Sequence, residues 1–126
     1  MKKKGMLIFW ILVLVLVVGG LGASFFVNTG PGQLDGFAQC LKDKGATFYG
    51  AFWCPHCQAQ KRLFGKSAAL LPYVECSTPD GQGQLQIGKD KGIQQYPTWD
   101  FADGTRLNGE VPLAQLAEKT SCTLPQ

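Results

Sequence analysis

Four residues, Cys54-Pro55-His56-Cys57, place the strongest constraint on what this chain can fold into. They follow an apolar, aromatic run that predicts a buried strand over Thr47–Trp53, and they precede a helical pattern over 54–64. Two cysteines separated by two residues at a strand-to-helix junction form a redox-active dithiol when the surrounding fold supports them. The rest of the sequence must therefore supply a sheet and helices around this junction.

The N-terminal segment does not read as part of a globular domain. Lysines at positions 2–4 precede an uncharged stretch from Gly5 to Val27, and its centre, Met6–Val18, is unbroken apolar sequence. The stretch approaches the roughly 20 residues that a bilayer-spanning helix needs. Because the lysines lie on one flank only, we expect the N-terminus in the cytoplasm and the rest of the chain exported.

A cleaved signal peptide is the alternative, because small residues suited to cleavage surround positions 22–23. An uncleaved anchor is favoured, since Phe25–Val27 prolongs the apolar run and no Ala-x-Ala motif occurs. Both alternatives place the domain outside the cytoplasm, in a periplasm, a lumen or at the cell exterior. The expected organisation is an anchor or signal peptide at 1–27, a linker at 28–33 and a folded domain at 34–126.

The exported part is electrically neutral and rich in cysteine. The formal charge of +3 comes from the three N-terminal lysines, because nine Lys/Arg and nine Asp/Glu lie from position 28 onward. This balance gives no indication of nucleic-acid binding. Most of the five cysteines should be paired in an oxidising compartment, and the odd number leaves at least one free or paired between molecules.

The hydrophobic pattern predicts an α/β fold with a mixed central sheet flanked by helices. Early strands separated by helices should pair in parallel, whereas the Asp103-Gly104 hairpin near the end must be antiparallel. The expected helices cover 34–44, 54–64, 85–93 and a last segment from Pro112, and the expected strands cover 47–53, 73–76, 98–102 and 105–107.

The segment Phe52–Cys57 resembles the active site of the thioredoxin superfamily, and its Pro-His dipeptide is typical of DsbA-type oxidases. The segment Tyr96–Thr98 resembles the cis-proline loop that faces the dithiol in that superfamily. Three runs, Tyr49–Gln58, Tyr73–Cys76 and Gly92–Trp99, are similar to the thioredoxin-like domain associated with bacterial and plant homologues of vitamin K epoxide reductase. The resemblance implies a thioredoxin-like fold over nearly all of the exported part.

The dithiol residues have distinct expected roles. Cys54 would lie at a helix N-terminus, where free N–H groups and the helix dipole stabilise a thiolate and make it the exposed nucleophile. Cys57, one turn further, would be the resolving thiol, and Pro55 fits the first helical turn. His56 can place a donor or partial charge near Cys54, which favours the reduced form and makes the disulfide more oxidising. An inert first-turn histidine is the alternative for His56.

The resemblance also implies a substrate groove beside the dithiol. Trp53, Tyr96, Pro97 and Thr98 would line this groove, with a cis peptide bond before Pro97. The alternative for Trp53, as for Trp99, is a packing role.

The remaining cysteines divide into a pair and a single thiol. We hypothesise a structural disulfide between Cys40, in the first helix of the domain, and Cys122, just past the last helix. In the related domains, Cys76 pairs with a cysteine about a dozen residues on, but Gly88 stands there in this chain. Cys76 is therefore expected to be unpaired, either as a buried inert thiol or as a regulatory or intermolecular one.

A buried acid precedes the dithiol in many thioredoxins and DsbA-type proteins, and Phe48 takes its place here. The proton acceptor for Cys57 is thus open, with water, His56 and Glu75 as the candidates.

Together these features predict a membrane-anchored, extracytoplasmic thiol–disulfide oxidase that uses the Cys54–Cys57 disulfide and no separate cofactor or metal. Its partners would be client proteins with thiols and a membrane protein resembling vitamin K epoxide reductase. One alternative is a reductase or isomerase kept reduced by a membrane donor. Another is a metal-binding module that uses Cys54, His56 and Cys57, although no second Cys-x-x-Cys motif or histidine is present to complete the site.

Overall fold

The computed structural model describes residues 2–28 and 30–126, in two compact units at Met1–Pro31 and Gly32–Gln126. Met1, in the expected anchor, and Thr29, in the expected linker, lie outside the described residues. The first unit is the helix α1, Lys2–Asn28. Its segment Lys3–Ala23 is long and apolar enough to cross a bilayer, a criterion that a signal sequence also meets.

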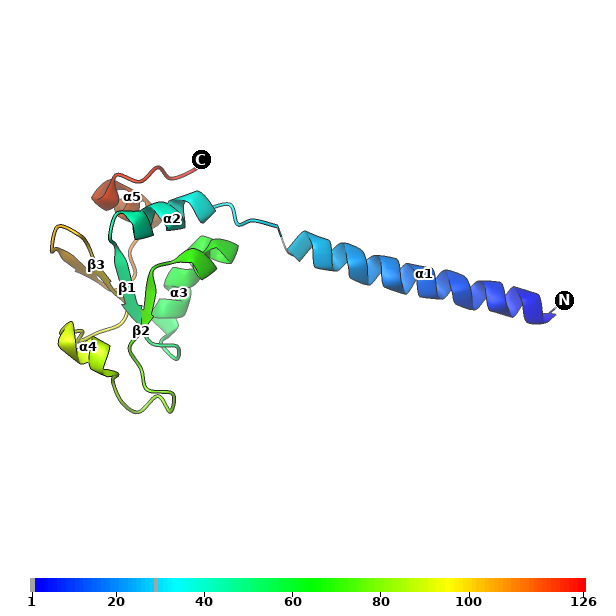
Figure 1. The fold of residues 1–126 in the computed structure, drawn as a ribbon, viewed down its shortest axis with the longest axis horizontal. Coiled ribbons are helices and arrows are strands. Elements are labelled where there is room, and N and C mark those ends of the chain that lie inside the picture. Colours follow the sequence, from blue (N-terminus) through cyan, green and yellow to red (C-terminus); the bar gives the residue numbers. More distant parts are fainter. Residues whose placement is uncertain (1, 29) are drawn as a thin grey trace. The chain divides into compact units, whose positions relative to one another are not determined.

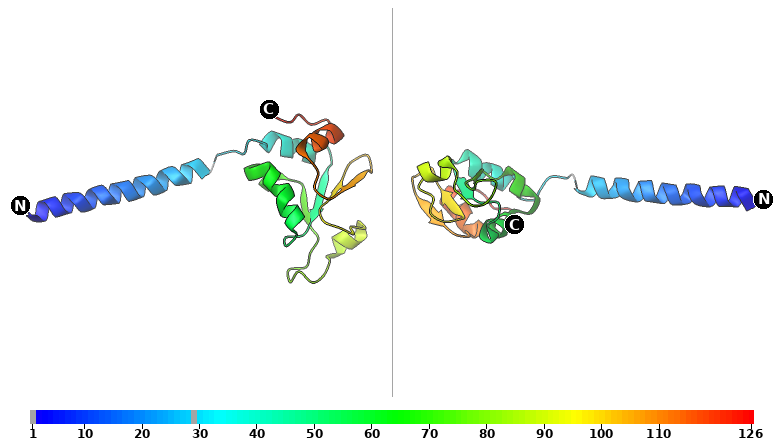
Figure 2. Two further views of the ribbon diagram at one scale, coloured as in Figure 1. Left: turned by 180° about the vertical axis from the view of Figure 1, so that it is seen from behind. Right: turned by 90° about the horizontal axis from the view of Figure 1, so that it is seen from below.

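The second unit is built on a four-stranded mixed sheet with the strand order β2-β1-β3-β4. The strands are β1 (Thr47–Gly50), β2 (Tyr73–Glu75), β3 (Thr98–Asp100) and β4 (Arg106–Asn108). β1 pairs in parallel with β2 and antiparallel with β3, which forms an antiparallel hairpin with β4. β1 therefore lies inside the sheet, between β2 and the β3–β4 hairpin, and Figure 1 and Figure 2 show helix α3 alongside the sheet.

Helices flank this sheet in the order that the sequence predicts, and the fold class is confirmed. Phe37, Ala38 and Leu41 follow helical spacing and are the buried residues of the first helix of the domain, while its polar residues face solvent. The helices are α2 (Asp35–Asp43), α3 (Pro55–Phe64), the 3-10 helix η1 (Gly65–Leu70), α4 (Gln86–Asp90) and α5 (Leu113–Thr120).

Several predicted boundaries are wrong, and the most consequential one is the end of β1. The apolar run predicts a strand through Trp53, but β1 ends at Gly50 and the chain turns over the next three residues. In this turn Cys54 N donates to Ala51 O at 3.0 Å, which closes the chain into the start of α3. The short helix α4 also ends before Ile93, which packs against the sheet instead.

Aromatic side chains form the centre of the core. Phe48 of β1 stacks on Trp99 of β3 with ring centroids 4.8 Å apart, and it meets the edge of the Tyr73 ring at 5.2 Å. Phe37 of α2 stacks on Phe64 of α3 at 5.9 Å. The rings come from α2 and α3 and from β1, β2 and β3, so they join these elements in one core. Each such pair contributes about 0.5–1.5 kcal/mol beyond the apolar area it buries.

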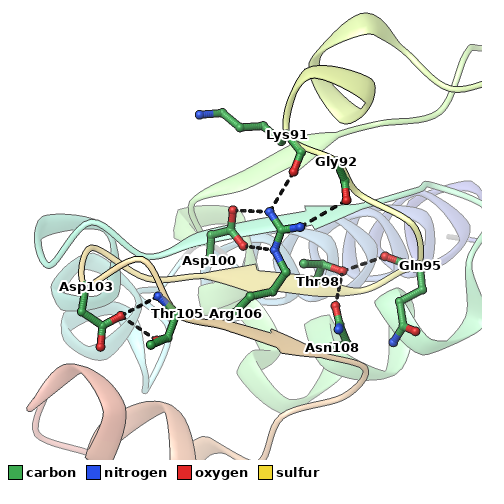
Figure 3. Close-up of polar contacts among 9 residues, drawn as sticks. All are labelled: Lys91, Gly92, Gln95, Thr98, Asp100, Asp103, Thr105, Arg106 and Asn108. Atoms are coloured by element: carbon green, nitrogen blue, oxygen red, sulfur yellow. Dashed lines mark hydrogen bonds and ion pairs between the residues drawn. The ribbon is translucent and has the colours of Figure 1, made fainter.

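Arg106 on β4 fixes the segment that leads into β3. Its guanidinium pairs with both carboxylate oxygens of Asp100, at 2.6 and 2.8 Å, and donates to the carbonyls of Lys91 and Gly92 (Figure 3). These contacts join the end of α4 to the hairpin. The loop between α4 and β3 is thereby held at both of its ends.

A disulfide joins α2 to the end of the chain. Cys40 of α2 is bonded to Cys122, just after α5, with Cα atoms 5.9 Å apart and 82 residues of separation. Figure 1 shows α5 ending beside α2. The bond therefore closes a loop that contains every strand of the sheet.

Replacing both Cys40 and Cys122 by alanine should lower the free energy of unfolding by about 4 kcal/mol, because the unfolded chain regains the entropy of an open loop of this length. Urea denaturation of the full chain in detergent, followed by tryptophan fluorescence, measures the change. An unaltered unfolding midpoint would show that the cross-link contributes nothing to stability.

Candidate active site

The dithiol lies where β1 passes into α3. Cys54 is the N-cap of α3 with extended backbone (φ −75°, ψ 119°), and its carbonyl accepts the first helical bond from Gln58 N at 3.1 Å. Pro55 occupies the first turn, where its missing N–H costs no helical bond. Cys57 follows one turn later, so both cysteines lie at the start of the helix, where the first backbone N–H groups have no partner within the helix.

The two sulfurs are less accessible than the sequence indicates. Cys54 is 5% exposed and Cys57 is fully buried in this reduced state, so the prediction that Cys54 is exposed is wrong, whereas its role as the nucleophile stays a prediction. Cys54 Sγ lies 3.6 Å from the carbonyl oxygen of Tyr96, to which it donates. Burial raises the pKa of the Cys57 thiol to about 12, so Cys57 is a protonated thiol at neutral pH.

Trp53 and Tyr96 lie on the exposed side of the dithiol. The Trp53 ring is half-exposed, meets the Tyr96 ring edge-on at 6.0 Å and donates from Nε1 to Ser77 Oγ at 2.8 Å. Trp53 is thus fixed beside Cys54 with an open face. Trp99, by contrast, is fully buried in the core.

The loop opposite the dithiol contains a cis peptide bond between Tyr96 and Pro97. Pro97 and Thr98 are both buried. The Thr98 hydroxyl donates to Gln95 O at 2.8 Å and lies 3.0 Å from Asn108 Oδ1, as Figure 3 shows. Thr98 therefore holds the loop in place, and Tyr96 contacts Cys54 through its carbonyl oxygen, while the substrate groove itself stays a prediction.

His56 points toward an acidic residue, Glu110, that no sequence motif indicates. Its Nδ1 lies 3.3 Å from Glu110 Oε2, and both side chains are exposed. The residue after Glu110 is fixed by two hydrogen bonds to α3. The buried Gln60 amide donates to Val111 O at 3.0 Å and accepts from Val111 N at 2.7 Å. No local pattern marks Glu110, because 54 residues separate it from His56.

Glu75, at the end of β2, contacts the turn before the dithiol. Its Oε1 accepts from Phe52 N at 3.2 Å and from Ser77 N at 2.9 Å. Its Oε2 accepts from the Tyr73 hydroxyl at 2.7 Å. One carboxylate therefore joins β2 to the backbone that leads into Cys54.

Cys76 is a buried free thiol beside Tyr49 and Ile93. Burial raises the pKa of Cys76, so its thiol is protonated at neutral pH and reacts poorly with dissolved reagents. A side chain at Gly88 would meet the Gln84 side chain, with Cγ 2.9 Å from the Cβ position. A cysteine could not occupy position 88 unless Gln84 moved.

The metal-binding alternative gains no support from the geometry. Within the described ranges 2–28 and 30–126, no three His, Cys, Asp or Glu side chains cluster as a metal site requires.

The comparisons with known proteins point to thiol–disulfide chemistry. The chain is 47% identical over 94 residues to thiol-disulfide oxidoreductase LTO1 from Arabidopsis thaliana, a match that covers 71% of this chain and 24% of LTO1. It is 38% and 37% identical over 68 residues to protein disulfide-isomerase A2 from Pongo abelii and Homo sapiens, matches that cover 50% of this chain and 13% of each relative. No protein-family model matches the chain.

The chain therefore spans about a quarter of LTO1 and about an eighth of each protein disulfide-isomerase. Together with the mixed sheet flanked by helices, these similarities support a place in the thioredoxin-like superfamily.

The three free thiols should differ in reactivity. In the reduced protein at pH 8, iodoacetamide should label Cys54 first, because Cys57 and Cys76 are fully buried and burial keeps both protonated. Mass spectrometry of peptides after timed quenching measures the order, and protein unfolded in guanidinium should label all three alike. Labelling of Cys57 before Cys54 would contradict the assignment of Cys54 as the reacting thiol.

Proposed function

We propose that this chain is a thiol–disulfide oxidoreductase whose reacting groups are Cys54 and Cys57. The observation that carries the proposal is the arrangement of two adjacent thiols at the start of α3, with Cys54 Sγ against the carbonyl that precedes Pro97. The relatives named as a thiol-disulfide oxidoreductase and as protein disulfide-isomerases support it.

The favoured direction is oxidation of client proteins. A client thiolate attacks Cys54 of the Cys54–Cys57 disulfide, and Cys57 leaves as a thiolate that takes up a proton. The second client thiolate then attacks the client sulfur of the mixed disulfide, so the client gains a disulfide and Cys54 leaves reduced. The half-exposed ring of Trp53 offers an apolar surface for the client beside Cys54.

The reduced pair must pass two electrons onward before the next cycle. We propose that a membrane protein resembling vitamin K epoxide reductase accepts them, as the sequence resemblance implies. Helix α1 would anchor the chain in the same membrane and keep the domain, on the extracytoplasmic side, near that partner. Tethering would raise the effective concentration of the two proteins for each other.

A reductase or isomerase is the second candidate function. The similarity to protein disulfide-isomerase A2 over half of this chain favours it. The same residues would act, but a membrane donor would keep Cys54 and Cys57 reduced. The two functions differ in the resting oxidation state of the pair.

Trapping tests the proposed function directly. Cys57→Ala removes the thiol that resolves the mixed disulfide, so clients and the recycling partner should accumulate on Cys54 as adducts that a reductant releases. Non-reducing electrophoresis with mass spectrometry identifies them, and a Cys54→Ala/Cys57→Ala variant is the matched control. Adducts of equal abundance in the control would refute the assignment.

His56 should set the oxidising strength of the pair. If the imidazole of His56, in the first turn of α3, stabilises the Cys54 thiolate, His56→Ala should shift the equilibrium of Cys54/Cys57 with glutathione about 10-fold toward the disulfide, equivalent to about 30 mV. Trp53 fluorescence in glutathione buffers of defined ratio follows the equilibrium. A shift toward the dithiol would show that His56 acts in the opposite sense.

A further inference from the structure

The buried position of Cys57 creates a requirement for a proton acceptor. Cys57 must lose its proton whenever it attacks a mixed disulfide on Cys54, and it must regain one whenever it leaves. It is fully buried, and burial raises its pKa to about 12, so bulk solvent neither touches the sulfur nor ionises it readily. An internal group must therefore exchange this proton if the step is to be fast at neutral pH.

Tyr73 is the polar side chain that the fold brings beside Cys57. β1 and β2 run in parallel with Gly50 opposite Glu75 and Phe48 opposite Tyr73. At Gly50, the position that a Cβ would take lies 2.9 Å from Cys57 Sγ and 3.4 Å from the Tyr73 hydroxyl. The sulfur and the hydroxyl thus both border the space that a side chain at Gly50 would fill, and this shared space brings them near enough for proton transfer.

The Tyr73 hydroxyl leads onward to a carboxylate. It donates to Glu75 Oε2 at 2.7 Å, while Glu75 Oε1 is held by the amides of Phe52 and Ser77. Burial, followed by the hydrogen bond to Glu75, raises the pKa of Tyr73, so the phenol remains protonated. A proton that leaves Cys57 can therefore pass by way of the Tyr73 hydroxyl to the Glu75 carboxylate.

We propose that Tyr73 and Glu75 form a proton-accepting pair for Cys57, a role that rests on the proposed dithiol function. As the Cys57 proton passes to Tyr73 Oη, the hydroxyl proton of Tyr73 passes to Glu75 Oε2. The Cys57 thiolate attacks Cys54 Sγ, the Cys54–Cys57 bond forms, and the bond from Cys54 to the client sulfur breaks with its electron pair on the client. The same transfers run backward when Cys57 is the leaving group.

The other candidate acceptors are placed less favourably. His56 has a side chain that is 69% exposed and faces Glu110. Water does not contact the fully buried Cys57 in this structure, so it can take the proton only when the site opens.

Other ionisable groups near the pair bear on its pH dependence. Lys61 of α3 lies with Nζ 3.6 Å from the centre of the Tyr73 ring, where its charge favours the Cys57 thiolate. The neighbouring thiols of Cys54 and Cys76 and the Tyr96 hydroxyl complete the surroundings. Each of these groups is retained in the variants below.

The test uses the reduced full chain in detergent and 5,5′-dithiobis(2-nitrobenzoate), which releases thionitrobenzoate in two phases. The first phase reports attack by Cys54 on the reagent, and the second reports attack by Cys57 on the resulting mixed disulfide. Glu75→Gln keeps one oxygen that can accept from both the Phe52 and the Ser77 amide, and Tyr73→Phe keeps the ring. In either variant we expect the second phase to slow by about 10- to 100-fold at pH 7, while the first phase keeps its rate.

The pH profile separates proton transfer from a structural effect. Without the internal acceptor only hydroxide can take the proton, so the second-phase rate of Glu75→Gln should rise about 10-fold per pH unit between pH 6 and 9, and the wild-type profile should be flatter. The matched controls are Tyr49→Phe, a buried tyrosine in the separate cluster with Cys76, and Glu118→Gln on the exposed face of α5. Both controls should keep the wild-type rate and profile.

Two results would overturn the proposal. One is a second phase of wild-type rate and profile in both Glu75→Gln and Tyr73→Phe, and the other is equal slowing in the controls. If one variant fails to fold, as judged by its urea midpoint, the other decides. Failure of the proposed function gives a different result. Wild-type protein and Cys57→Ala would then release thionitrobenzoate in the same way, without a second phase that depends on Cys57.

Discussion

The turn between β1 and α3 is the constraint on which the rest of the site depends. β1 ends at Gly50, four residues before Cys54, and the bond from Cys54 N to Ala51 O starts the helix there. This geometry puts Cys54 at the N-cap and Cys57 in the first turn beneath it. Because Gly50 has no side chain, Cys57 and Tyr73 can both approach the strand at less than 3 Å from the Cβ position.

The supporting contacts come from distant parts of the chain, and each one orders a segment that faces the dithiol. Arg106 holds the start of the Tyr96–Pro97 loop through two backbone carbonyls. Gln60, buried in α3, holds the segment of Glu110 against His56. A charge-assisted or doubly paired hydrogen bond is stronger than a single neutral one, which suits these contacts to fixing loops. The two thiols are thus surrounded by segments that polar side chains from distant parts of the chain hold in place.

The fold was predictable from the sequence because its elements have clear periodicity and its turns have clear residues. The strand limits were less predictable, since Phe52 and Trp53 have strong strand propensity yet lie half-exposed in the turn before Cys54. The dithiol was marked by a local motif. The contacts of Glu110 and Glu75 with the site were not, because hydrogen bonds between segments far apart in sequence leave no pattern in a single chain. Burial of Cys54 was likewise set by tertiary packing against Tyr96 rather than by its place at a helix start.

The proposed direction of electron flow, with Cys54 and Cys57 as an oxidising pair, can be read from the oxidation state of the two cysteines in living cells. Cells that express the full chain are quenched with acid, which stops thiol exchange, and free thiols are then alkylated with a reagent that alters electrophoretic mobility. Cys40→Ala/Cys122→Ala and Cys57→Ala variants assign the bands. An oxidising pair requires that most of the protein carry the Cys54–Cys57 disulfide at steady state. A pair found mostly reduced would contradict the oxidase and favour a reductase or isomerase.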